Sequence, residues 1–220
     1  MPAYSASHPR KIALTGGIAS GKSLVGEYLR QKGIPVIDAD DVVHQLLRDD
    51  EALKFKIHAE FGPAVFTPAG AVDRPALGQQ VFGDAPERVA RRKLLESWIH
   101  PETRAVMERF YEEHAEAPLG VASIPLLFES SLEDRYDEVW LLQSATETQL
   151  ERLLQKRGMT QEAALARIQN QMPAAEKLAR AQRHPCHAVL DNNDDPAHLY
   201  QQIDALLSVA LIAANQEPPV

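Results

Sequence analysis

The sequence predicts an α/β fold in which five parallel strands form one sheet flanked by helices. A glycine-rich loop joins an apolar run at 11–15 to a helical pattern, a second apolar run follows at 34–37, and strand-like runs return after a long helical stretch. Short apolar runs without alternation are typical of parallel strands, because these are buried on both faces. With 220 residues, 45% of them apolar and 25% charged, the chain can bury such a core.

The first strand–helix–strand unit is expected between residues 11 and 37. After the glycine-rich loop, Leu24, Val25, Tyr28 and Leu29 recur at helical spacing, and Gly33 stands where a helix C-terminal glycine is expected. Two strands and a helix within about thirty residues are the size of a right-handed βαβ crossover.

The region after this unit divides into helical and strand-like parts. Between residues 51 and 117 the chain has amphipathic stretches such as 86–116 but no strand-like run, which predicts an inserted helical lobe. The other expected elements are a helix at 41–48, strands at 119–127, 138–142 and 187–190, a charged helical segment at 147–183, and a final helix at 196–213.

Composition restricts the partners. A net charge of −8 and a pI near 5.5 argue against nucleic acid, because binding to a phosphate backbone depends on clustered cations. The single cysteine, Cys186, suits a reducing compartment, and no run approaches the ~20 apolar residues of a membrane span. We therefore expect a cytoplasmic protein that acts on a small molecule, as a monomer or a small homo-oligomer, without a membrane partner.

The glycine-rich loop, Gly16 to Ser23, fits the pattern G-x-x-x-x-G-K-[S/T] between a predicted strand and a predicted helix. In this pattern backbone N–H groups and the helix N-terminus hold phosphate, the lysine bridges the β- and γ-phosphates, and the serine hydroxyl binds Mg²⁺. The pattern predicts ATP and Mg²⁺, with Ser23 as the metal ligand. The expected nucleotide-binding residues here are Gly17, Ile18, Ala19, Ser20, Gly21, Lys22, Ser23 and Leu24.

Two carboxylates, Asp38 and Asp40, follow the second strand. If the strand continues, both point the same way at the sheet edge where α/β proteins bind ligands, and one can accept the proton of an attacking hydroxyl. The alternative is that Asp38 caps the next helix. The third strand lacks a terminal aspartate and Glu129 is the nearest acid, so we expect Mg²⁺ to rely on Asp38 or Asp40 through water.

Several runs together carry a resemblance to a known family. They are LTGGIASGKS (14–23), VIDADDVVHQLL (36–47), His100-Pro101 with Arg104, PLLFES (125–130), ETQLERL (147–153) with Arg157, and VLDNN (189–193). With these motifs nearly the whole chain resembles the dephospho-coenzyme A kinases, which transfer the γ-phosphoryl group of ATP to the ribose 3′-hydroxyl of dephospho-coenzyme A (dephospho-CoA).

The resemblance implies a P-loop fold in which the strands lie in the order second, third, first, fourth, fifth. It also implies a nucleotide-binding core at 1–50, 118–146 and 184–220, a substrate lobe at 51–117 and a lid at 147–183. The implied site residues are Thr15 and Asp40 at the acceptor, His100 and Arg104 in the lobe, Arg152 and Arg157 in the lid, and Asn192 at the adenine. Asp40 is the implied base, the two lid arginines bridge the phosphates, and Lys22 completes the catalytic set.

The chain departs from the family pattern at three places. Ala19 replaces a usual glycine, so we expect that position to avoid a positive φ, which a Cβ makes costly. Leu24 replaces a usual threonine, although Ser23 still supplies the metal hydroxyl. The segment 182–187 is longer than usual and lacks an alanine–aspartate pair, which affects the expected adenine contacts.

Two alternatives remain open from the residues alone. A nucleoside or nucleotide kinase shares the core, lobe and lid but reads a base in its lobe. A nucleotide-dependent switch hydrolyses slowly and needs no acceptor. The chain has no Asn-Lys-x-Asp element for guanine, which favours adenine and weakens the switch.

Overall fold

The computed structural model describes residues 9–215, with side chains up to residue 211. It divides into two compact units, one of Met1–Asp38 with Tyr111–Val220 and one of Ala39–Phe110. We call them the sheet unit and the helical unit and describe each by itself. The outer ends of the predicted core, 1–8 and 216–220, lie outside the described residues.

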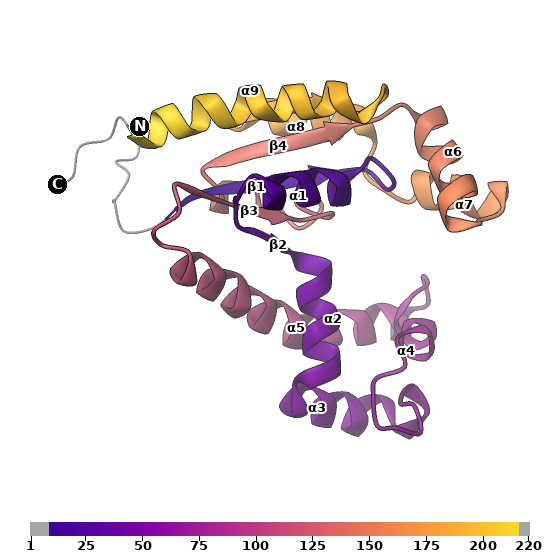
Figure 1. Ribbon diagram of the computed structural model, residues 1–220. Helices are drawn as coiled ribbons and strands as arrows, with labels where there is room; N and C mark the ends of the chain where they lie inside the picture. Colours follow the sequence, from indigo (N-terminus) through magenta and orange to yellow (C-terminus); the bar gives the residue numbers. More distant parts are fainter. Residues whose placement is uncertain (1–8, 216–220) are drawn as a thin grey trace. The chain divides into compact units, whose positions relative to one another are not determined.

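The sheet unit contains five parallel strands in the order β2-β3-β1-β4-β5 (Figure 1), which confirms the predicted fold and strand order. Because β1 is central, the loop that follows it lies at the middle of the sheet's carboxyl edge. The strands are β1 (Arg10–Gly16), β2 (Val36–Asp38), β3 (Leu119–Ser123), β4 (Glu138–Gln143) and β5 (His187–Asp191).

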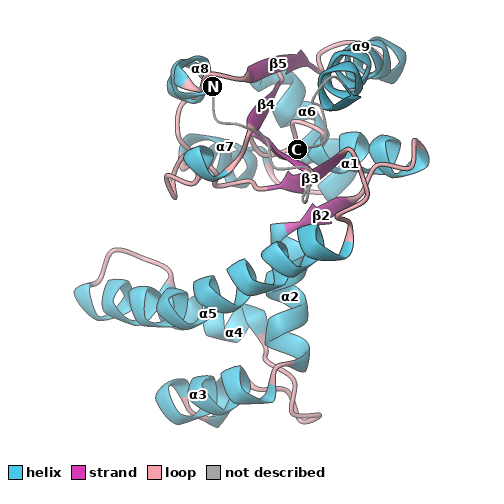
Figure 2. Ribbon diagram, turned by 90° about the vertical axis from the view of Figure 1, so that its left-hand side faces the viewer, coloured by secondary structure: helices cyan, strands magenta, loops and turns pink. Residues whose placement is uncertain are grey.

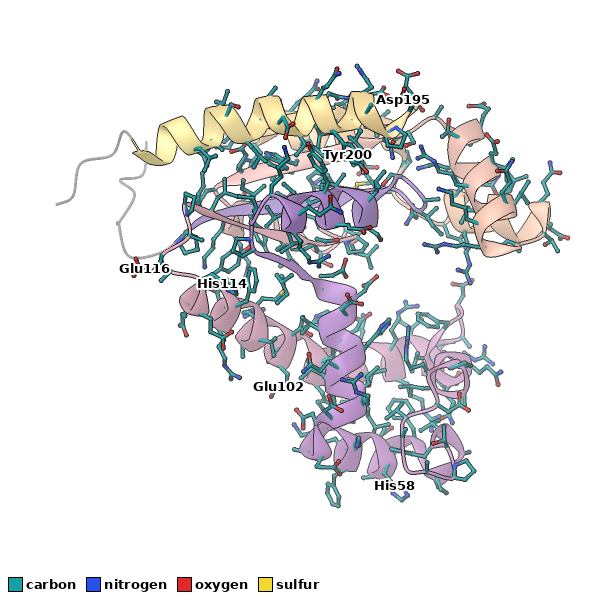
Figure 3. All side chains as sticks on the ribbon, in the orientation of Figure 1. His58, Glu102, His114, Glu116, Asp195 and Tyr200 are labelled. Carbon is teal, nitrogen blue, oxygen red and sulfur yellow. The ribbon has the colours of Figure 1, made fainter. Side chains whose placement is uncertain are left out.

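Helices cover both faces of this sheet. Helices α1 and α9 pack on one face, where Ile12 and Leu14 of β1 meet Leu29 and Ile203, and Figure 2 shows α8 on the opposite side. Tyr200 of α9, labelled in Figure 3, stacks on Tyr28 of α1 with ring centroids 4.0 Å apart. The helices of this unit are α1 (Lys22–Gln31), α6 (Thr146–Arg157), α7 (Gln161–Gln169), α8 (Ala174–Arg183) and α9 (Pro196–Asn215), with a 3₁₀ turn at Glu133–Arg135.

The helical unit has a core of its own. Ile57, Phe61, Leu77 and Val81 are buried in one apolar cluster. Its elements are α2 (Ala39–Asp49), α3 (Glu51–Phe61), a 3₁₀ turn at Pro63–Val65, α4 (Arg74–Val81) and α5 (Pro86–Glu113), whose last residues belong to the sheet unit. The structure thus counts α2 with the helical unit, whereas the predicted lobe began at residue 51.

Two strand predictions were wrong in extent. The third strand ends at Ser123 and not at residue 127, because Pro125 has no N–H to donate and restricts the residue before it. The second strand covers Val36–Asp38, and α2 begins directly after it, with Asp40 and Asp41 in its first turn. Acidic residues are favoured there by the helix dipole. Asp38 and Asp40 therefore do not share a strand face as predicted.

None of the helices in the described part of the chain combines the length and the apolar character that crossing a bilayer requires.

Candidate active site

The loop between β1 and α1 has the geometry of a phosphate-binding loop. Gly21 adopts φ 105°, and a Cβ built on it would lie 2.2 Å from the Asn192 side chain, so only glycine fits. Lys22 begins α1, and its Nζ donates to the carbonyl oxygens of Gly16 at 2.8 Å and Gly17 at 3.0 Å. The ammonium is thereby held across the loop at a helix N-terminus, where anions are favoured.

Ala19 takes a positive φ of 56°, so the prediction that this position avoids one was wrong. The prediction considered only the local cost of a Cβ, roughly 1–2 kcal/mol in the left-handed region. The surrounding contacts of the loop outweigh that cost, as expected where the rest of a structure fixes a strained residue.

Replacing Ala19 by glycine is therefore expected to stabilise the protein. Ala19→Gly removes the Cβ penalty and should raise the free energy of unfolding by about 1 kcal/mol, or the melting temperature by about 2–4 °C. Calorimetric melting measures this. Ala166→Gly, at an exposed position inside α7, is the matched control and should lower stability, because glycine weakens a helix interior. A loss of stability in both variants would contradict the strain at Ala19.

Side chains from three other segments contact the back of the loop. The Asn192 amide donates to the Ser20 carbonyl at 2.6 Å. The Arg152 guanidinium donates to the carbonyls of Ala19 at 3.2 Å and Asn192 at 2.8 Å. The Ser144 hydroxyl, after β4, donates to the Asn192 carbonyl at 2.9 Å and lies 3.3 Å from that of Ser20. The two predicted residues, Asn192 and Arg152, thus meet at the loop. Both donate hydrogen bonds to its backbone carbonyls, and Arg152 also donates to the backbone of Asn192.

Two glutamines that the sequence analysis missed lie over the start of the loop. Gln171, between α7 and α8, accepts a hydrogen bond from the Ile18 N–H at 2.7 Å. Gln149 of α6 lies so close to Gly17 that a Cβ there would be 2.5 Å from its amide nitrogen. Both line a cavity of about 490 Å³ beside the loop, together with Lys177 and Asn193. Gln149 was within the ETQLERL run, but nothing in the sequence placed it against the loop.

Oxygen-bearing side chains end the strands beside the loop. Asp38, the last residue of β2, pairs in register with Ser123, the last residue of β3. In the described part of the chain, the buried hydroxyls of Ser123 and Thr15 have no hydrogen-bond partner. Glu129, by contrast, forms an ion pair with buried Lys177 at 2.7 Å. The carboxylate nearest the end of β3 is therefore held in a structural pair.

Four further predicted residues are exposed on helices. Arg157 is exposed in the last turn of α6. Asp40, His100 and Arg104 are exposed residues of the helical unit: Asp40 stands in the first turn of α2, and the other two lie one turn apart on α5. The spacing of His100 and Arg104 places them on one face of that helix.

A family model and curated relatives indicate one family, and solved structures share the fold. The family model for dephospho-CoA kinase matches residues 10–197. A dephospho-CoA kinase from Shouchella clausii is 40% identical over 204 residues, which cover 91% of this chain and 98% of the relative. The solved structure of TT1252 from Thermus thermophilus has a TM-score of 0.77 at 36% identity and covers 92% of this chain and 98% of that one. A dephospho-CoA kinase from Campylobacter jejuni shares the fold, with a TM-score of 0.61 at 21% identity, covering 92% of this chain and 97% of that one.

Proposed function

The chain belongs to the dephospho-CoA kinase family, whose members are ATP-dependent transferases, and from this premise we propose how its own residues perform the reaction. The γ-phosphoryl group of ATP passes to the ribose 3′-hydroxyl of dephospho-CoA, which gives CoA and ADP. The observation that carries the proposal is the phosphate loop, with Lys22 Nζ fixed between two loop carbonyls at the end of the central strand.

The loop supplies the ATP side of the reaction. Its N–H groups and the N-terminus of α1 favour the phosphates, and Lys22 places a positive charge where charge develops on the γ-phosphoryl group. The transition state of phosphoryl transfer is loose, so positioning and charge stabilisation dominate. The exposed Arg157 adds a second cation from α6, while the charge of Arg152 stays at the back of the loop.

The residues beside the loop also fit Mg²⁺, which prefers oxygen ligands and keeps several waters. Ser23 presents a hydroxyl in the first turn of α1, and Asp38 and Ser123 end neighbouring strands, with the Ser123 hydroxyl buried and unsatisfied within the described residues. Ser23 would bind Mg²⁺ directly in this proposal, and Asp38 and Ser123 would hold it through water. When bound, the ion neutralises part of the triphosphate charge.

Asp40 is the proposed base on the acceptor side. Its carboxylate accepts the proton of the 3′-hydroxyl as that oxygen bonds to the γ-phosphorus and the bond from phosphorus to the β-phosphate oxygen breaks. His100 and Arg104 present polar groups on one face of α5, and we assign them to dephospho-CoA binding. We assign Thr15, directly before the loop, to the acceptor as well, because its buried hydroxyl has no hydrogen-bond partner within the described residues.

The setting of the enzyme follows from the same premise. We propose a cytoplasmic monomer or small homo-oligomer, supported by the free, exposed thiol of Cys186, which suits a reducing compartment. We place the adenine in the cavity beside the phosphate loop. Asn193, which follows β5, lines this cavity.

An acceptor panel tests the function. ADP release is measured with Mg²⁺ and ATP, with dephospho-CoA or with nucleosides and nucleoside monophosphates, and products are weighed by mass spectrometry. Release that depends on dephospho-CoA, with a product heavier by one phosphoryl group, is the expected result. Turnover on a nucleotide instead, or equal hydrolysis without any acceptor, would contradict the assignment and leave only ATP use.

A further inference from the structure

Three side chains converge on the carbonyl oxygens at the back of the phosphate loop. The Ser20 carbonyl accepts from Asn192 Nδ2 at 2.6 Å, with Arg152 Nη1 at 3.4 Å and Ser144 Oγ at 3.3 Å beside it. Arg152 Nη1 also donates to the Ala19 carbonyl at 3.2 Å. We call Asn192, Arg152 and Ser144 the carbonyl clamp.

The clamp is itself tied together. Arg152 Nη2 and Ser144 Oγ both donate to the Asn192 backbone carbonyl, at 2.8 and 2.9 Å, and Arg152 Nη1 donates to Ser144 Oγ at 3.1 Å. The Asn192 N–H donates to the carbonyl of Gln143 at the end of β4, at 2.9 Å. Asn192 is only 3% exposed. The backbone of this buried residue is held at both its N–H and its carbonyl, so the side-chain amide has a fixed starting point. Losing the hydrogen bond of that amide is costly because it is buried.

The clamp determines the direction of the Gly21 N–H group. In a trans peptide the C=O of one residue and the N–H of the next point to opposite sides of the chain. Because the Asn192 amide holds the Ser20 carbonyl, the Gly21 N–H turns toward the side opposite the clamp. The Ser20 N–H, by contrast, donates within the loop to the Gly17 carbonyl at 3.3 Å.

The clamp also accounts for the backbone of Ala19. This residue stands at φ 56° with its own carbonyl and that of the next residue held from outside. A non-glycine residue stays in the left-handed region only where its surroundings fix it. The Asn192 amide is the shortest of these contacts, and the absence of a side chain at Gly21 allows it to lie against the loop.

From this geometry we propose that Asn192 is a positioning residue for the triphosphate of ATP. Together with Arg152 and Ser144 it holds Ala19 in its left-handed conformation and directs the Gly21 N–H group at the phosphates. This differs from the adenine contact expected of Asn192 from the family pattern. The inference rests on ATP binding at the loop, as proposed above, and not on the identity of the acceptor.

The test measures nucleotide binding without any acceptor, so a failure of the acceptor assignment does not affect it. Calorimetric titration with ADP and with inorganic tripolyphosphate, both with Mg²⁺, is applied to wild type, Asn192→Ala and Asn192→Asp. Both variants lose the amide donor, and the second keeps the shape of the side chain. We expect both ligands to bind about tenfold or more weakly to both variants, since a buried acceptor loses its shortest donor. Asn170→Ala, at the exposed end of α7, is the control and should bind as wild type.

Ala19→Gly provides the second arm. If the clamp acts by holding Ala19, glycine at 19 should recover much of the ADP affinity in Asn192→Asp, because glycine reaches positive φ without a Cβ penalty. In steady state, KM for ATP should rise in Asn192→Asp while KM for dephospho-CoA stays unchanged. Weaker ADP binding with unchanged tripolyphosphate binding would show an adenine contact and overturn the proposal. Wild-type affinity in both Asn192 variants, or no recovery by Ala19→Gly, would overturn it as well.

Discussion

Lys22→Ala is expected to reduce kcat/KM by about 10³-fold or more. The reason is the fixed position of the ammonium: Nζ is held by the carbonyls of Gly16 and Gly17 at 2.8 and 3.0 Å, at the N-terminus of α1. A cation held in place before the reaction stabilises developing charge without reorganisation. The measurement is ADP release at saturating dephospho-CoA over a range of ATP concentrations.

Lys56→Ala is the matched control for this prediction. Lys56 is exposed in α3, and Lys56→Ala removes the same charge from the helical unit. The kcat/KM of this variant should stay near wild type. Thermal melting checks that both variants fold. Near-normal turnover in Lys22→Ala would contradict the role of the loop, and an equal loss in both variants would indicate an effect of net charge alone.

The central part of the fold could be read from the sequence because local signals there agree. Around β1 and α1, the apolar run, the glycine pattern and the helical spacing all predict the same boundaries, and the structure places β1 at Arg10–Gly16 and α1 at Lys22–Gln31. The end of β3 could not be read in this way. Leu127 and Phe128 are fully buried although they follow the strand, and an apolar run indicates burial without distinguishing a strand from a buried turn.

The site was predictable only where its chemistry lies within one motif. The loop and Lys22 follow from a local pattern, whereas its supporting contacts join residues far apart in sequence, such as Ser20 with Asn192 and Ile18 with Gln171. Such tertiary contacts also decide the backbone of Ala19, where the local argument gave the wrong sign of φ. Local chemistry predicts what a residue prefers, and the packing around it decides whether that preference is met.

Asp40→Asn is expected to lower kcat by about 10²–10⁴-fold while the dissociation constant for ATP stays near wild type. Asparagine keeps the size of the side chain but cannot take the proton of the 3′-hydroxyl. Single-turnover phosphoryl transfer to dephospho-CoA measures the chemical step, and ATP titration without acceptor measures binding. A collapse of ATP affinity would instead indicate that Asp40 serves the metal and not the acceptor.

Asp41→Asn separates the position of the carboxylate from its charge. Asp40 and Asp41 both lie in the first turn of α2, where the helix dipole favours a negative charge. Each contributes about 0.3–1 kcal/mol to the free energy of unfolding. Their loss should therefore lower stability to a similar extent, and a melting curve measures that shared effect. If Asp40 is the base, only Asp40→Asn loses the chemical step. Equal loss of kcat in the two variants would mean that the negative charge at the start of α2, and not one placed carboxylate, is what the reaction needs.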